Sequence, residues 1–146
     1  AKGVFLSCSE PPKLLKETCD LCITILTGPE VLTGSTRMKA GTATKLALNI
    51  ISTGAMVKLG KSYGNLMVDL TATNSKLVDR SERILMETTG VDRARAKAAL
   101  EASGGSVKTA IVMVRRDLSR ADAEKLIVEH QGKLRPIVGP PPEVTG

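Results

Sequence analysis

Residues 4–27 read VFLSCSEPPKLLKETCDLCITILT and contain two apolar runs separated by a short helical pattern. The runs at 4–9 and 21–27 are continuous rather than alternating, which is typical of parallel strands covered on both faces. Two prolines at 11 and 12 suit a first helical turn, and we expect a helix over residues 13–19. Strand, helix and strand in such a short span predict a βαβ unit and therefore an α/β fold.

Two strands alone do not make a stable covered sheet. We therefore expect this chain to be the C-terminal part of a larger α/β domain, or to be completed by another chain. Residues 46–60, LALNIISTGAMVKLG, are apolar on almost every side and predict a buried helix that begins between Ser35 and Thr42. Residues 61–75 mix turn formers with one apolar cluster, and we expect them to pack against the sheet.

The character of the chain changes at Lys76, after which charged, amphipathic patterns predict a small all-helical subdomain. Capping residues and glycine stops predict the following helices: 76–88, 92–103, 106–116 and 119–130. A short turn at 133–138 and a disordered tail at 139–146 complete the chain. The expected organisation is therefore a sheet region (1–75), a helical subdomain (76–138) and a tail (139–146).

The helical region contains an internal repeat with an offset of 27 residues, since residues 91–96 (VDRARA) align with residues 118–123 (LSRADA). Gly105 aligns with Gly132 at the same offset. The shared unit is a capped helix, a glycine stop and a second helix. The repeat predicts that both glycines end helices and that Ala96 and Ala123 lie where helices approach closely.

The composition argues against several kinds of partner. Aromatic residues make up 1% of the 146 residues, which argues against a protein that stacks single-stranded nucleic acid on aromatic rings. The net charge is +6, but the charges alternate in sign along each predicted helix, which indicates solvated faces rather than a helix that reads a nucleic-acid groove. No apolar run reaches the roughly 18 residues of a membrane span, and residues 1–12 show no signal-peptide cleavage pattern. We therefore expect neither a nucleic-acid nor a membrane partner.

The three cysteines lie at positions 8, 19 and 22. An odd number, confined to one end of the chain, does not fit a disulfide framework and predicts a reducing compartment, the cytoplasm. Cys19 and Cys22 have redox or metal-site spacing, but they do not sit at a strand-to-helix turn and lack two further ligands. We expect buried or half-buried free thiols and no metal.

Residues 28–45, GPEVLTGSTRMKAGTATK, form the stretch with the clearest chemical character. They follow a parallel strand at its carboxyl end, where open α/β sheets bind ligands. Glu30 follows the strand at once, Ser35 and Thr36 supply hydroxyls, and Lys39 supplies a positive charge. Small hydroxyl residues and N–H groups at a helix N-terminus can hold an anion such as phosphate. From the residues alone, an ordinary capped helix with solvated Arg37 and Lys39 is the favoured alternative, and the spacing of a P-loop is absent.

This stretch closely resembles the signature of the N-acetylmuramic acid 6-phosphate etherases and their relatives, the glucokinase regulatory proteins. Residues 49–77 and 84–113 resemble the etherase branch in particular, and the resemblance covers residues 3–138. It implies a sugar isomerase (SIS) domain, which is a parallel sheet with helices on both faces. It also implies a C-terminal helical region similar to ubiquitin-associated (UBA) domains, in agreement with the change of character at residue 76.

The resemblance implies that Glu30, Ser35, Thr36 and Lys39 line a sugar 6-phosphate site. The two glutamates that act as acid and base in the family match nothing in this sequence, so no catalytic residue is implied here. The family cleaves the lactyl ether of N-acetylmuramic acid 6-phosphate to N-acetylglucosamine 6-phosphate and D-lactate during cell-wall sugar recycling. No metal or organic cofactor is implied, and a homodimer is expected.

The second branch of the resemblance implies a different function, that of a non-catalytic, sugar-phosphate-sensing protein that binds a sugar kinase. The same loop would serve both functions. The etherase-like stretch after residue 49 and the small size of the helical region favour the lyase. On that hypothesis, this chain is the C-terminal portion of the enzyme and is inactive alone.

Overall fold

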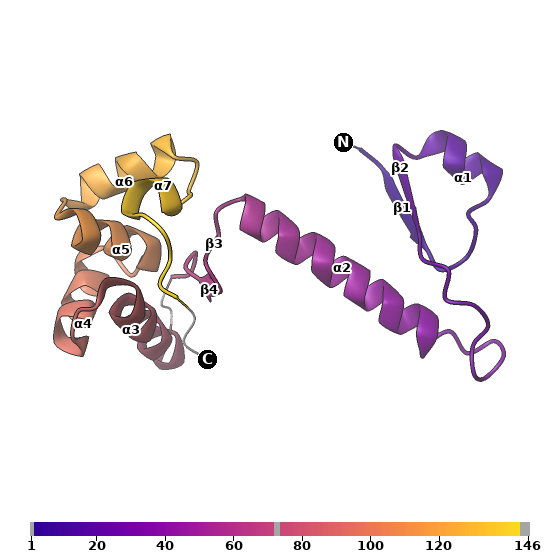
Figure 1. Ribbon diagram of the computed structural model, residues 1–146, viewed down its shortest axis with the longest axis horizontal. Helices are drawn as coiled ribbons and strands as arrows, with labels where there is room; N and C mark the ends of the chain where they lie inside the picture. The colour runs from indigo at the N-terminus through magenta and orange to yellow at the C-terminus, as the bar shows by residue number, and fades with distance from the viewer. Residues whose placement is uncertain (1, 72–73, 144–146) are drawn as a thin grey trace. The chain divides into compact units, whose positions relative to one another are not determined.

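The computed structural model describes residues 2–71 and 74–143, and the chain divides into two compact units, Ala1–Gly54 and Ala55–Gly146 (Figure 1). The first unit contains strands and helices, and the second is mainly helical. The expected boundary at residue 75 coincides with the start of a helix at Ser75, whereas the second compact unit extends back to Ala55.

The βαβ unit predicted from residues 4–27 is confirmed. Strand β1 (Val4–Ser7) is followed by helix α1 (Lys13–Thr18) and strand β2 (Leu21–Thr24). The two strands pair in parallel, with Val4 opposite Leu21 and Ser7 opposite Thr24. The fold class is therefore α/β, with strands shorter than the apolar runs that predicted them.

Helix α2 (Lys39–Lys58) begins inside the predicted interval, but the prediction that it is buried is wrong for this chain. None of its residues is buried, and large apolar side chains such as Ile50 (71% exposed) and Leu46 (54% exposed) face solvent. The physical reason is the size of the sheet, because two short strands present too little surface to cover a 20-residue helix. The apolar pattern therefore predicted the helix correctly, but it did not show which residues would cover the helix.

The segment after α2 forms a two-residue hairpin, with β3 (Ser62–Tyr63) and β4 (Leu66–Met67) antiparallel. Gly64 opens its two-residue loop at φ +63°, a conformation that favours glycine at this position of a hairpin. Tyr63 and Val68 are buried in the core of the helical unit. The expectation that residues 61–75 pack against the sheet is therefore wrong, because their apolar side chains complete the helical core instead.

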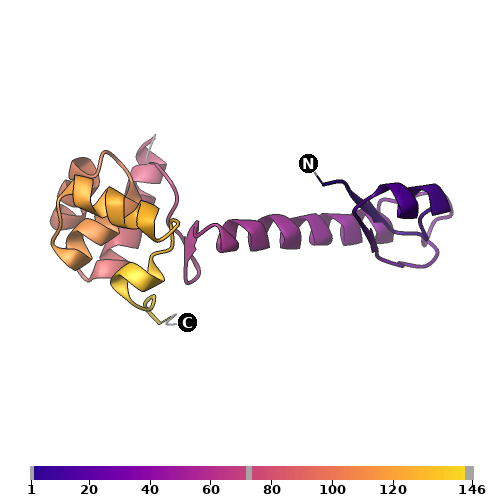
Figure 2. The same cartoon turned by 90° about the horizontal axis from the view of Figure 1, so that it is seen from above.

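Among the described residues of the second unit, five helices follow the hairpin: α3 (Ser75–Thr89), α4 (Arg93–Ala102), α5 (Val107–Arg116), α6 (Arg120–Glu129) and α7 (Arg135–Val138). Helix α5 is central and contacts α3, α4, α6 and α7, and Figure 2 shows the same bundle from a second side. This position explains its continuous burial, since Val107, Ala110, Ile111 and Val112 are all fully enclosed.

The repeat predicted from the sequence is present in the helix boundaries and caps. Helices α4 and α6 begin 27 residues apart, at Arg93 and Arg120, and end 27 residues apart. Each has a side-chain cap at the equivalent position, where Asp92 accepts from an N–H of the first turn of α4 and Ser119 does so for α6. These caps are the reason that the two helices share their starting register.

The helix ends and close contacts of the repeat are also confirmed. The N–H of Gly105 donates to the carbonyl of Leu100, and the N–H of Gly132 donates to that of Ile127, both at 2.8 Å. Both glycines have positive φ, +84° and +76°, and follow the last turn of a helix. The equivalent alanines, Ala96 and Ala123, are completely buried between helices.

Residues 139–143 do not fit the expectation of a disordered tail. The hydroxyl of Tyr63 donates to the carbonyl of Gly139 at 3.1 Å and to that of Pro140 at 2.6 Å. The backbone after α7 is therefore held against the hairpin. Residues 144–146 of the expected tail lie outside the described residues.

Candidate functional site

The loop between β2 and α2 begins at the carboxyl ends of the two parallel strands. The N–H of Ile25 donates to the carbonyl of Ser7 at 2.9 Å, which continues the strand pairing into the loop. Beyond β1, the thiol of Cys8 lies 3.4 Å from the hydroxyl of Thr44 and 3.5 Å from the carbonyl of Ala40. These contacts hold the first turns of α2 next to the strand ends, where ligands bind in open α/β sheets.

The carboxylate of Glu30 caps the N-terminus of α2. Its two oxygens accept from the N–H groups of Lys39 and Ala40, each at 3.0 Å. These hydrogen bonds, first that from Ala40 and then that from Lys39, hold the pKa of Glu30 below its usual value. A negative charge is therefore already present at the anion-binding end of the helix.

Lys39 joins the same cluster from the other side of the loop. It is the first residue of α2, and its ammonium group donates to the carbonyl of Pro29 at 2.8 Å. The predicted residues Glu30 and Lys39 are therefore brought together at one helix start. Both side chains form hydrogen bonds within the protein. The cap formed by Glu30 is the alternative to a ligand site that the sequence left open.

Ser35 and Thr36 lie in the turn that precedes α2. Their backbones shape this turn, because the N–H of Ser35 donates to the carbonyl of Leu32 at 3.0 Å and the N–H of Gly41 donates to that of Thr36 at 2.8 Å. Within residues 2–71 and 74–143, neither hydroxyl has a hydrogen-bond partner. Ser35 is half-buried and Thr36 is exposed, so both hydroxyls are free to contact a ligand.

The four predicted residues thus lie in the loop or at the start of α2: Glu30 caps the helix, Lys39 binds a loop carbonyl, and Ser35 and Thr36 offer free hydroxyls. A phosphate at this helix start would bind beside the Glu30 carboxylate or displace it. Arg37 is exposed and is the nearest further source of positive charge in the sequence. In the described part of the chain, no three of the His, Cys, Asp and Glu side chains are grouped as a metal site.

The cysteines are free and half-buried, as expected. Cys8 contacts α2, and the thiol of Cys22 lies 3.6 Å from the carbonyl of Leu15 in α1. The pair at 19 and 22 forms no disulfide. Their contacts indicate that these thiols fill space between the strands and helices of the first unit.

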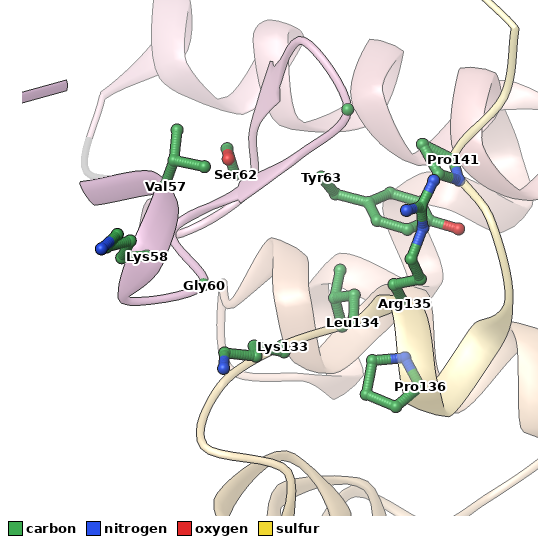
Figure 3. A pocket seen from close by; sticks show the side chains of 11 residues that line it. Val57, Lys58, Gly60, Ser62, Tyr63, Lys133, Leu134, Arg135, Pro136 and Pro141 are labelled. Atoms are coloured by element: carbon green, nitrogen blue, oxygen red, sulfur yellow. The ribbon is translucent and has the colours of Figure 1, made fainter. Parts of the chain in front are cut away.

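One group of basic residues was not predicted from the sequence as part of a site. Lys58, Lys133 and Arg135 are among the residues that line a cleft in the second unit, and Figure 3 shows Arg135 beside Tyr63. The only signal in the sequence is that basic residues accompany a glycine in two separate segments, near Gly60 and near Gly132. Nothing in a linear pattern indicates that these two segments meet.

Among the helices of the described residues, none combines the length and apolarity required to cross a bilayer. No protein-family model matches the sequence. Comparison with curated proteins does give relatives. The chain is 55% identical over 131 residues to a protein of Klebsiella aerogenes, which covers 90% of this chain and 43% of that protein.

Two further relatives agree with the first. A protein of a Synechococcus strain is 58% identical over 81% of this chain and 37% of its own length, and one of Nostoc punctiforme is 51% identical over 94% of this chain and 44% of its own. All three belong to one class, enzymes named as etherases. By sequence, the chain belongs to the N-acetylmuramic acid 6-phosphate etherase family. It spans less than half the length of these relatives.

Proposed function

We propose that this chain is the C-terminal portion of a carbon–oxygen lyase that converts N-acetylmuramic acid 6-phosphate to N-acetylglucosamine 6-phosphate and D-lactate. The observation that carries the proposal is the identity of 51–58% with proteins named as N-acetylmuramic acid 6-phosphate etherases. The relatives named above give no support to the regulatory, kinase-binding alternative.

The role of the chain in this reaction is to supply one wall of the sugar 6-phosphate site. Ser35 and Thr36 have free hydroxyls, and Lys39 supplies a positive charge at the adjoining start of α2. Glu30 both caps α2 and borders this wall. Loss of a proton α to a carbonyl and expulsion of lactate need positioned acid–base groups and a neutralised phosphate. The proposal places the acid and base outside this chain and needs no metal or organic cofactor.

The larger context that we propose is a SIS-type domain followed by a UBA-like helical subdomain. The parallel β1–β2 pair supports the first part, and the repeated helix pairs support the second. Exposed apolar side chains along α2 support a missing covering layer and assembly as a homodimer. The free thiols support a reducing compartment, and we place the protein in the cytoplasm.

A chimera tests this proposal. The Klebsiella aerogenes relative, with its matching 43% replaced by this chain, is expected to release lactate from N-acetylmuramic acid 6-phosphate. The isolated chain is expected to release none, because the proposal places the acid and base outside it. A chimera that unfolds at the melting temperature of the parent but releases no lactate would contradict the proposal, as would lactate release by the isolated chain.

In the same chimera, we expect Lys39→Ala to weaken sugar-phosphate binding more than Lys45→Ala does. Lys39 is the first residue of α2 and contacts the loop, whereas Lys45 lies further along the helix. Loss of one charge-assisted contact corresponds to about tenfold in affinity or more. Titration of each variant with N-acetylglucosamine 6-phosphate measures the effect. An equal or larger effect at Lys45 would argue against the placement of the site.

A further inference from the structure

A cleft of about 910 Å³ lies within the helical unit, and no residue that lines it carries a negative charge. Its walls come from residues 57–64, 133–136 and Pro141, all of which belong to the second unit. Lys58, Lys133 and Arg135 supply three positive charges to these walls (Figure 3). Pockets that bind small molecules have volumes of the same order, about 300–1,000 Å³.

The three basic side chains are not neutralised by the protein. Each is exposed, and within residues 2–71 and 74–143 none forms an ion pair, in contrast to Lys61, whose ammonium group lies 2.7 Å from the carboxylate of Asp69. The positive charge of Arg115 also reaches this region, because its guanidinium donates to the carbonyl of Val138 at 3.1 Å. Uncompensated cations around a concave surface concentrate anions.

Apart from Ser62, the remaining lining residues are apolar side chains, glycines and Tyr63. Tyr63 is 4% exposed, and its hydroxyl is bound by two carbonyls, so the ring has a fixed position beside Pro141. Gly60 and Gly132 approach so closely that a Cβ on Gly60 would lie 2.7 Å from the carbonyl oxygen of Gly132. This contact joins the two segments that carry the cations. A cleft that is formed before binding loses little conformational freedom when a ligand enters.

We propose that this cleft is a binding site for a small phosphomonoester, separate from the loop at residues 28–45. A phosphomonoester carries close to two negative charges at neutral pH, which suits a cleft whose charged lining residues are all cations. Arginine and lysine are the usual partners of phosphate, the first through its planar fork and the second as a point charge. The organic part of the ligand lies against Pro136 and Pro141, which are not buried.

The site is located by nuclear magnetic resonance of the whole chain, titrated separately with glucose 6-phosphate, inorganic phosphate and glucose. Glucose 6-phosphate is expected to shift the backbone amides of residues 60–64 and 133–135 and to bind more tightly than inorganic phosphate, while glucose shifts none of them. Shifts confined to residues 28–45 would overturn the proposal. So would equal affinity for glucose 6-phosphate and inorganic phosphate, or the absence of any shift in the cleft.

Substitution then assigns the binding to the cations. Lys133→Gln with Arg135→Gln is expected to weaken glucose 6-phosphate binding by about tenfold or more, because two charge-assisted contacts are lost. The matched control is Lys97→Gln with Lys125→Gln, which removes the same charge from exposed positions of α4 and α6, and is expected to change the affinity less than twofold. Equal losses in the two double variants would overturn the site. Should the first variant fail to fold, the amide shifts of the unaltered chain decide the question.

Discussion

Gly60→Ala is expected to lower the free energy of unfolding of the helical unit by about 3 kcal/mol. Gly60 has φ +70°, where an added side chain costs about 1 kcal/mol or more. The new methyl group would also lie 2.7 Å from the carbonyl oxygen and 2.8 Å from the carbonyl carbon of Gly132. These are backbone atoms that cannot turn aside, so the substitution separates the two segments or distorts both.

Gly90→Ala is the matched control. Gly90 has nearly the same backbone conformation, with φ +76° at the end of α3, but an added Cβ meets no atom within 4 Å. We therefore expect only the conformational cost, about 1 kcal/mol. Urea unfolding followed by far-ultraviolet circular dichroism compares the two. If both variants lose the same stability, the close approach of Gly60 to Gly132 contributes nothing.

Asp69→Ala is expected to destabilise the same unit by about 2 kcal/mol, because it leaves a buried ammonium group without its partner. The side chain of Lys108 is only 9% exposed, and its Nζ lies 3.1 Å from the carboxylate of Asp69. Loss of one partner from a fully buried pair costs about 3–5 kcal/mol, and the 35% exposure of Asp69 reduces that figure. Lys108→Met removes the buried charge itself and is expected to cost less than about 1 kcal/mol.

The pH dependence of stability provides a second measurement on these variants. The pKa of Asp69 lies below its usual value, chiefly because it accepts a hydrogen bond from Lys61 and, to a smaller extent, one from Lys108. A carboxylate whose folded-state pKa is depressed stabilises the fold above its unfolded pKa of about 4 and loses this contribution as the pH falls further. Asp69→Ala should therefore remove part of the acid sensitivity of the unaltered chain. A variant that keeps the full acid sensitivity would show that Asp69 does not contribute.

Features that depend on neighbouring residues were predictable from the sequence. The βαβ unit follows from two apolar runs and a short helical pattern, and the repeat follows from caps and glycines at a fixed offset. Asp92 and Ser119 start their helices through contacts only three residues away, with no need of the rest of the fold. Contacts over such short separations can be predicted directly from the sequence.

Features that depend on distant residues were not predictable. The apolar pattern of α2 shows that the helix prefers to be covered, but it does not show whether the covering residues lie in the same chain. Tyr63 gives no sign in the sequence that its partners are the carbonyls of Gly139 and Pro140. The meeting of Gly60 with Gly132, which shapes the cleft, is likewise a product of the folded chain alone.

The candidate site was predictable only in part, because some of its features depend on neighbouring residues and others on distant ones. Its loop is recognisable by its small hydroxyl residues and its position after a strand. Whether Glu30 faces a ligand or the helix depends on the path of residues 31–38, which the sequence does not specify. The structure shows Glu30 capping the helix, while Ser35 and Thr36 keep free hydroxyls and Lys39 keeps its positive charge beside the loop.

The buried ring of Tyr63 gives the protein an internal optical probe. The chain contains one tyrosine and no tryptophan, so its tyrosine fluorescence arises from one side chain at the edge of the cleft. Unfolding of the helical unit exposes this ring and releases its hydroxyl from two carbonyls. The tyrosine fluorescence of the whole chain therefore reports on one defined location, without any label.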